Sequence, residues 1–135
     1  MVRLYLMSGA ILAGLAVAAG AFASHALKAR LDDLYEISAE ADRALSIFET
    51  GARYQMYHAL GLILISLLIN RAEISQSFLT ASGGAFLIGI ALFSGSLYAL
   101  SLTGIKWLGA IAPLGGAAFL IGWICVAIAA WSYKG

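Results

Sequence analysis

Long apolar runs separated by short polar stretches make up most of this chain. Each run is close to the roughly 20 residues that a helix needs to cross the hydrocarbon core of a bilayer. The runs lack the period-two alternation of barrel strands, so we expect helices. The pattern predicts four membrane-spanning helices, at about residues 4–23, 48–69, 78–102 and 107–131.

Short polar turns at residues 70–77 and 103–106 join the last three predicted helices. Short connections make consecutive helices antiparallel neighbours. We therefore expect an all-α fold, a four-transmembrane-helix bundle that forms a single membrane domain over residues 1–135. Two details stay open. Pro113 either kinks the fourth helix or lies in its first turn. Residues 21–23 match a signal cleavage site, although we expect an uncleaved first helix.

The stretch between the first two predicted helices is the main hydrophilic part of the chain, with six of its seven acidic residues within positions 24–53. Apolar residues recur there at spacings of three and four, which predicts an amphipathic acidic helix in the loop 24–47, with Ser38 as one possible N-cap. Helices that lie on a membrane surface are usually basic. The acidic character favours packing on the bundle itself or on another protein.

Composition agrees with a membrane protein, since 62% of the residues are hydrophobic and 11% are charged, against about 25% charged in soluble domains. A net charge of +1 gives no basis for a nucleic-acid partner. The expected partners are membrane lipids and, with them, a protein partner or further copies of the chain. Basic residues are more numerous on the side of the 24–53 loop. The positive-inside rule then places both termini on the non-cytoplasmic side of a bacterial inner membrane.

Small residues spaced four apart predict close helix packing, because they let backbones approach each other in lipid. The glycines in this pattern are Gly14, Gly20, Gly89, Gly116 and Gly122, and we expect the same packing role for Gly95, which lies between Ser94 and Ser96.

The stretch ETGARYQMYHAL, residues 49–60, gathers polar groups where the second predicted helix begins. Polar groups at membrane depth are costly unless they are paired, so they normally face the bundle interior. The end of the first helix reaches the same side, which brings His25 into plausible reach. The predicted network, ligand-binding or structural, comprises His25, Glu49, Arg53, Tyr54, Gln55, Tyr57 and His58.

Three interpretations of this network remain open: a structural tie, a ligand or lipid-headgroup site in which Arg53 binds an anionic group, and metal or haem ligation by His25 and His58. Two histidines are few for a metal, so we expect no metal and no cofactor. The motifs G-x-S-x-G, H-E-x-x-H, CxxC and the P-loop do not occur in the sequence. We expect a non-enzymatic accessory, assembly or ligand-binding protein. The alternative is a small transporter or channel formed by an oligomer.

Four motifs, GAFASHALK, ETGARYQMYHAL, FSGSLYAL and IAPLGGAAFLIGW, occur in this order along nearly the whole chain. In this the sequence resembles an uncharacterised family of small integral-membrane proteins, domain of unknown function 423, with YgdD-like and transmembrane protein 256-like members. The resemblance implies a four-helix membrane protein and no established activity. Two departures stand out: Ala23 or Ser24 where the family usually has glycine, and a longer, more acidic loop. The family pattern points to Gly20, His25, Ala26, Glu49, Arg53, Tyr54, Gln55, His58, Ser94, Gly95, Ser96, Pro113 and Gly116.

Overall fold

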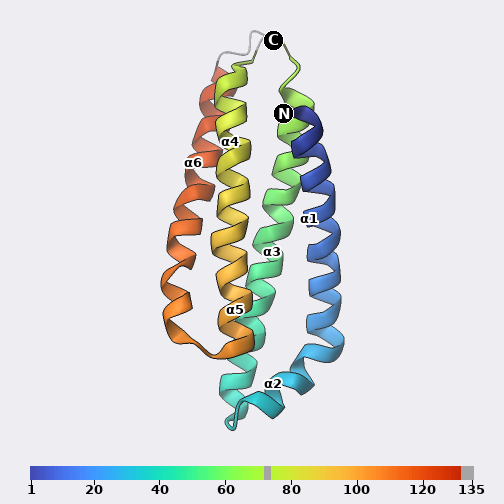
Figure 1. Ribbon diagram of the computed structural model, residues 1–135, viewed down its shortest axis with the longest axis vertical. Helices are drawn as coiled ribbons and strands as arrows, with labels where there is room; N and C mark the ends of the chain where they lie inside the picture. The colour runs from blue at the N-terminus through green and yellow to red at the C-terminus, as the bar shows by residue number, and fades with distance from the viewer. Residues whose placement is uncertain (72–73, 132–135) are drawn as a thin grey trace.

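The computed structural model describes residues 1–71 and 74–131, and these form helices joined by short turns (Figure 1). The longer helices lie side by side and antiparallel, and α1 begins at the same end of the bundle at which α6 ends. The elements are α1 (Val2–Phe22), the π-helical turn η1 (Ala23–Leu27), α2 (Lys28–Leu34), α3 (Ser38–Leu68), α4 (Gln76–Gly89), the π-helical turn η2 (Ile90–Ser94), α5 (Gly95–Thr103), the 3-10 turn η3 (Lys106–Ala110) and α6 (Ala112–Trp131).

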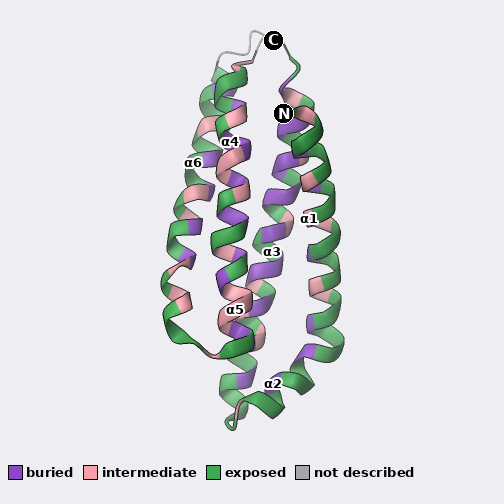
Figure 2. Ribbon diagram, viewed as in Figure 1, coloured by how far each residue is buried: buried purple, intermediate pink, exposed green. Residues whose placement is uncertain are grey.

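Three helical segments of the described chain are long and apolar enough to cross a membrane: Val2–Leu34, Gln76–Thr103 and Lys106–Trp131. Their outward faces carry exposed apolar side chains, and the buried positions face the middle of the bundle (Figure 2). The prediction of an all-helical membrane protein is therefore confirmed. The crossing predicted at residues 48–69 is not among these segments, because the polar residues in the first half of α3 lower its hydropathy.

Helix α3 begins ten residues before the predicted boundary, at Ser38 rather than at about residue 48. The predicted loop is therefore divided between α2 and the first turns of α3. Ser38 is the first helical residue and Ile37 takes the N-cap position, with no side-chain cap. The helix continues because Ala41, Ala44 and Phe48 lie on one face at helical spacing, and all three are buried.

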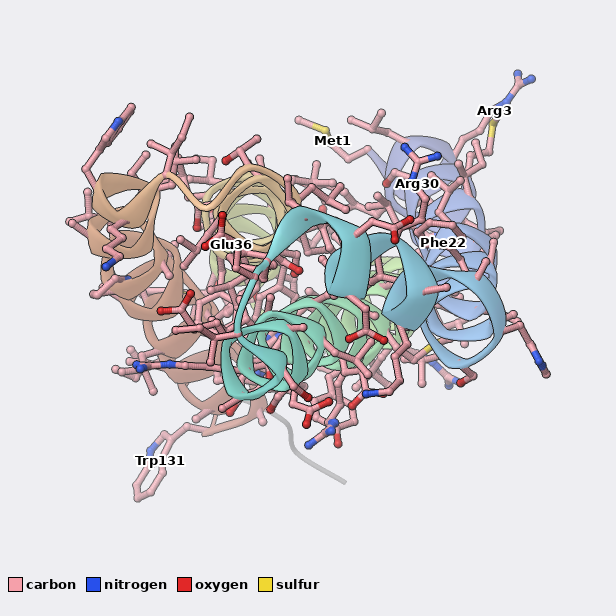
Figure 3. All side chains as sticks on the ribbon, turned by 90° about the horizontal axis from the view of Figure 1, so that it is seen from below. Met1, Arg3, Phe22, Arg30, Glu36 and Trp131 are labelled. Atoms are coloured by element: carbon pink, nitrogen blue, oxygen red, sulfur yellow. The ribbon has the colours of Figure 1, made fainter. Side chains whose placement is uncertain are left out.

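The acidic segment packs on the bundle itself, one of the two options that its composition left open. Ala23, Leu27 and Leu31 form a small core with the buried face of α3. Seen along the bundle in Figure 3, α2 crosses the end of the bundle. The side chain of Trp131 projects outward from the bundle in the same view. The stripe is therefore covered within this chain along the first turns of α3, whereas its earlier members Leu34 and Ile37 are exposed.

Two hydrogen bonds join this end of the bundle to α5. The Tyr35 hydroxyl donates to the Ser101 carbonyl oxygen at 3.0 Å, and the Ser101 hydroxyl donates to the Ala44 carbonyl oxygen at 2.7 Å. Helix α5 ends beside them at Gly104, whose φ of 70° is left-handed. Glycine adopts this conformation without the penalty that a Cβ atom brings.

Close packing of α6 depends on glycines that face aromatic rings. A Cβ atom added to Gly89 would overlap the ring of Phe119, and one added to Gly122 would overlap the ring of Phe86. The close helix packing predicted at Gly14, Gly20 and Gly95 does not occur within this chain, because a Cβ atom added at each of them would face open space. Small-residue spacing alone does not tell which face of a helix meets a neighbour. At Gly116, an added Cβ would make ordinary contacts with Phe93.

Pro113 lies in the first turn of α6, which runs from Ala112 to Trp131. The proline therefore does not kink the middle of the helix, and its place in the first turn is the second of the two roles considered from the sequence. A proline fits there because the first helical N–H groups have no partner within the helix.

Candidate functional site: an aromatic groove between α3 and α6

His58 lies inside the bundle and uses both ring nitrogens. The imidazole is buried, with 4% of the residue exposed. Its Nδ1 lies 2.7 Å from the carbonyl oxygen of Tyr54, and its Nε2 lies 3.2 Å from the indole Nε1 of Trp123. A carbonyl oxygen can only accept and an indole N–H can only donate. His58 is therefore a neutral imidazole that donates through Nδ1 and accepts through Nε2.

Aromatic rings from three helical segments surround this imidazole. The ring of Phe119 stacks on it, with centroids 3.4 Å apart and planes at 6°, and Phe86 meets it edge-on at 5.1 Å. Tyr54, one turn before His58 in α3, stacks near it with centroids 6.2 Å apart and contacts the ring of Phe93 at 4.8 Å. This packing holds His58 in one orientation.

An open groove of about 740 Å³ borders the cluster on the outer face of α3 and α6. Its walls are almost entirely apolar or aromatic, with the tyrosine hydroxyls as the main polar groups. We call it the α3–α6 groove, and it is lined by Tyr54, Tyr57, His58, Phe93, Pro113, Gly116, Ala117, Phe119, Leu120 and Trp123. Its volume is in the range of small-molecule sites.

Gln55 joins three helices at the middle of the bundle. Its Nε2 donates to the carbonyl oxygen of Leu12 in α1 at 2.8 Å, and its Oε1 accepts from the hydroxyl of Tyr98 in α5 at 3.0 Å. The residue is buried. A buried amide whose polar atoms are paired fixes the register of the helices that it joins.

Two further predicted site residues lie on another face of α3. Glu49 and Arg53 are exposed and line a second groove of about 420 Å³ between α1 and α3. We call this the α1–α3 groove, and it is lined by Ala16, Gly20, Ser24, Glu49, Ala52, Arg53, Met56 and Tyr57. Within residues 1–71 and 74–131, the one ion pair joins Lys28 to Asp42, so Glu49 and Arg53 do not form one with each other.

The structure thus divides the predicted network into separate parts. His25 is exposed in η1 and lines neither groove, so it does not lie with His58. The division follows from helical geometry, since each step along α3 turns the side chain by about 100°. Gln55 and His58 then face inward, while Glu49 and Arg53 face outward.

Five aromatic partners of the site were not predicted from the sequence: Phe86, Phe93, Tyr98, Phe119 and Trp123. All but Phe86 occur within quoted motifs, but nothing in the pattern paired them with Tyr54, Gln55 or His58. No group of three or more histidine, cysteine, aspartate or glutamate side chains within the described ranges is arranged to hold a metal ion.

The fold defines a helical membrane protein with an aromatic groove on its apolar surface. Comparison with known proteins agrees that it is a membrane protein. The family model "Protein of unknown function (DUF423)" matches residues 19–116, and the chain belongs to this family. The chain is 45% identical over 131 residues to the UPF0382 membrane protein YwdK of Bacillus subtilis, covering 97% of this chain and 98% of that protein. It is 40% identical over 133 residues to the UPF0382 membrane protein SERP0230 of Staphylococcus epidermidis, covering 98% and 99%. No solved structure matches the chain.

Proposed function

We propose that this protein is a non-enzymatic, four-crossing protein of the bacterial inner membrane that binds an amphipathic small molecule or lipid in the α3–α6 groove. The observation that carries the proposal is an aromatic groove of about 740 Å³ on the membrane-facing surface. The proposal has three parts: a fourth crossing, a bound ligand and the absence of catalysis. Each part is supported by separate observations.

Support for a fourth crossing comes from the polar side chains of α3. Gln55, His58 and Ser66 are buried and hydrogen-bonded within the protein. The cost of placing polar groups in lipid falls when they are paired inside a bundle. From Phe48 to Leu68, α3 rises by about 30 Å at 1.5 Å per residue, which matches a bilayer core.

Cysteine labelling tests this topology. In a Cys125→Ser background, Glu36→Cys and Arg71→Cys lie beyond opposite ends of the crossing part of α3, at exposed positions. We expect a membrane-impermeant maleimide to label Arg71→Cys in intact cells and Glu36→Cys only after lysis, with the termini on the side of Arg71. Labelling of both positions from one side would contradict a fourth crossing.

Support for ligand binding without catalysis comes from His58 and its neighbours. Both imidazole nitrogens are engaged within the protein, so the ring has no free position for acid–base chemistry on a bound molecule. Tyr54 and Tyr57, which are 39% and 53% exposed as whole residues, contribute hydroxyl groups to a groove with otherwise apolar walls. One polar rim and a long apolar wall suit an amphiphile.

Photolabelling of the purified protein with a diazirine analogue of palmitate tests the ligand site. We expect labels on peptides that contain Tyr57 and Ala117. Ala117→Leu fills the groove and should lower labelling several-fold, whereas the matched change Ala130→Leu, at an exposed position outside both grooves, should leave it unchanged. Equal labelling of every membrane-facing peptide, unaffected by Ala117→Leu, would refute the site.

A further inference from the structure

We propose that the α1–α3 groove binds a phospholipid whose headgroup carries a primary ammonium group beyond its phosphate, with phosphatidylethanolamine as the representative. The phosphate would meet Arg53 and the ammonium would meet Glu49. This site is separate from the α3–α6 groove, although Tyr57 borders both. The inference rests on the four-crossing topology proposed above, which cysteine labelling measures independently.

The depth of Arg53 follows from contacts on either side of it. Toward the end where α2 lies, the rings of Phe22 and Phe48 are 6.1 Å apart. Toward the other end, Gln55 bonds to Leu12. Arg53 lies between these two contacts, beside a stretch of α1 that has no charged residue. Its Cα is therefore inside the apolar layer, about 7.5 Å deeper than that of Phe48 at 1.5 Å per residue.

A charge at this depth needs a partner or a path to the interface. Side chains on a helix lean toward its N-terminus, and the N-terminus of α3 lies at the end occupied by α2 (Figure 1). A long side chain that follows this lean brings its guanidinium toward the membrane surface, where lipid phosphates lie. It forms no ion pair within the described residues.

The order of the two charges matches an ammonium-bearing zwitterion. Glu49 precedes Arg53 by four residues, so the two lie on the same face about 6 Å apart, with Glu49 nearer the water. In phosphatidylethanolamine, likewise, the phosphate lies deeper than the ammonium group. Ala16 and Ala52 also line this groove, and Met56, three residues beyond Arg53 in α3, continues it toward the membrane interior as an apolar surface for an acyl chain.

The same charges argue against the alternatives. An anionic headgroup would satisfy Arg53 and be repelled by Glu49. A choline headgroup has no N–H to donate to the carboxylate, whereas a primary ammonium has three. A second copy of the chain in a symmetric parallel pair would bring Glu49 against Glu49 at equal depth, since all copies insert in one orientation.

Lipid binding to the full-length protein, delipidated in detergent, can be measured by native mass spectrometry. The probes are palmitoyl-oleoyl phosphatidylethanolamine, phosphatidylcholine and phosphatidylglycerol, with free phosphoethanolamine as the soluble arm. Because charge-assisted hydrogen bonds are strong, we expect the ethanolamine lipid to bind roughly tenfold more tightly than the other two. Free phosphoethanolamine should compete weakly, because it lacks the chains.

Three variants make the test specific. The exchange Glu49→Arg with Arg53→Glu keeps the composition and reverses the order of the charges, so the preference should disappear. Glu49→Gln removes the repulsion and should raise phosphatidylglycerol binding toward that of the ethanolamine lipid, a gain that misfolding cannot produce. Arg30→Gln, an exposed change on α2 outside this groove, serves as the control.

Equal binding of all three lipids would overturn the proposal, as would an unchanged preference in the exchanged variant. A dimer that Arg53→Gln dissociates, with no lipid preference, would replace the lipid with a second copy. Loss of photolabelling in the α3–α6 groove would leave this result unaffected, so the two ligand sites fail independently.

Discussion

The contact between α6 and η2 gives the sharpest test of the packing, because two adjacent glycines have opposite surroundings. A Cβ atom at Gly115 would overlap the backbone nitrogen of Phe93 and lie 2.7 Å and 2.8 Å from its Cβ and Cα. A Cβ at Gly116 would lie 3.9 Å from the ring of Phe93, an ordinary contact. Gly115→Ala therefore forces α6 away from its neighbour, and Gly116→Ala does not.

The magnitudes follow from these distances. Overpacking of this kind costs about 1–3 kcal/mol, and the clash is with backbone, which cannot rotate aside. Replacing glycine by alanine in a helix contributes up to about 1 kcal/mol in the stabilising direction at both positions. We expect Gly115→Ala to be less stable than Gly116→Ala by about 1–3 kcal/mol, since the propensity term is common to both and cancels.

Unfolding of the two variants in mixed micelles with increasing dodecyl sulfate, followed by tryptophan fluorescence and circular dichroism, measures this difference. Comparing the two variants with each other removes most of the uncertainty about the unfolded state, which keeps helix in detergent. Equal stability of Gly115→Ala and Gly116→Ala would refute the packing described for α6 and η2.

Three further changes test individual bonds by the same unfolding assay. Trp123→Phe keeps a ring but removes the donor to His58, and should cost about 0.5–1.5 kcal/mol; no change would mean that the bond is absent. Ser101→Ala removes the side-chain donor to the Ala44 carbonyl, which keeps its helical N–H partner, and should cost about 0.5–1.5 kcal/mol; a neutral result would place water there. Gly104→Ala introduces a Cβ at φ 70° and should cost about 1–2 kcal/mol; wild-type stability would mean that the turn is not left-handed.

Much of the architecture is predictable from local pattern. Apolar runs of membrane length and short polar turns predicted the helices that the structure has at α1, along α4 to α5, and at α6. The helical spacing of Ala41, Ala44 and Phe48 predicted an amphipathic segment. It did not show that this segment is continuous with α3, because a boundary between polar and apolar composition is not a boundary between helices.

The candidate site was predictable only in part. The stretch ETGARYQMYHAL marked the residues, and the expectation that paired polar groups face inward holds for Gln55 and His58. The prediction that grouped His25, Glu49 and Arg53 with these two residues was wrong. Separating Glu49 and Arg53 from Gln55 and His58 requires the direction in which each side chain leaves the helix axis. Proximity along the sequence could not supply it, since residues one or two apart on a helix face different neighbours.

Composition and local pattern were enough to show that the chain is helical, suits a membrane and gathers polar groups at residues 49–60, which lie in the middle of α3. These properties depend on composition and on short-range periodicity, which act within one helix. Only the tertiary structure shows which of those groups are paired and which face outward. It also shows that Tyr98 pairs with Gln55 and Trp123 with His58. It does so because the partners lie 43 and 65 residues away along the chain, and only packing of the helices brings them within hydrogen-bonding distance.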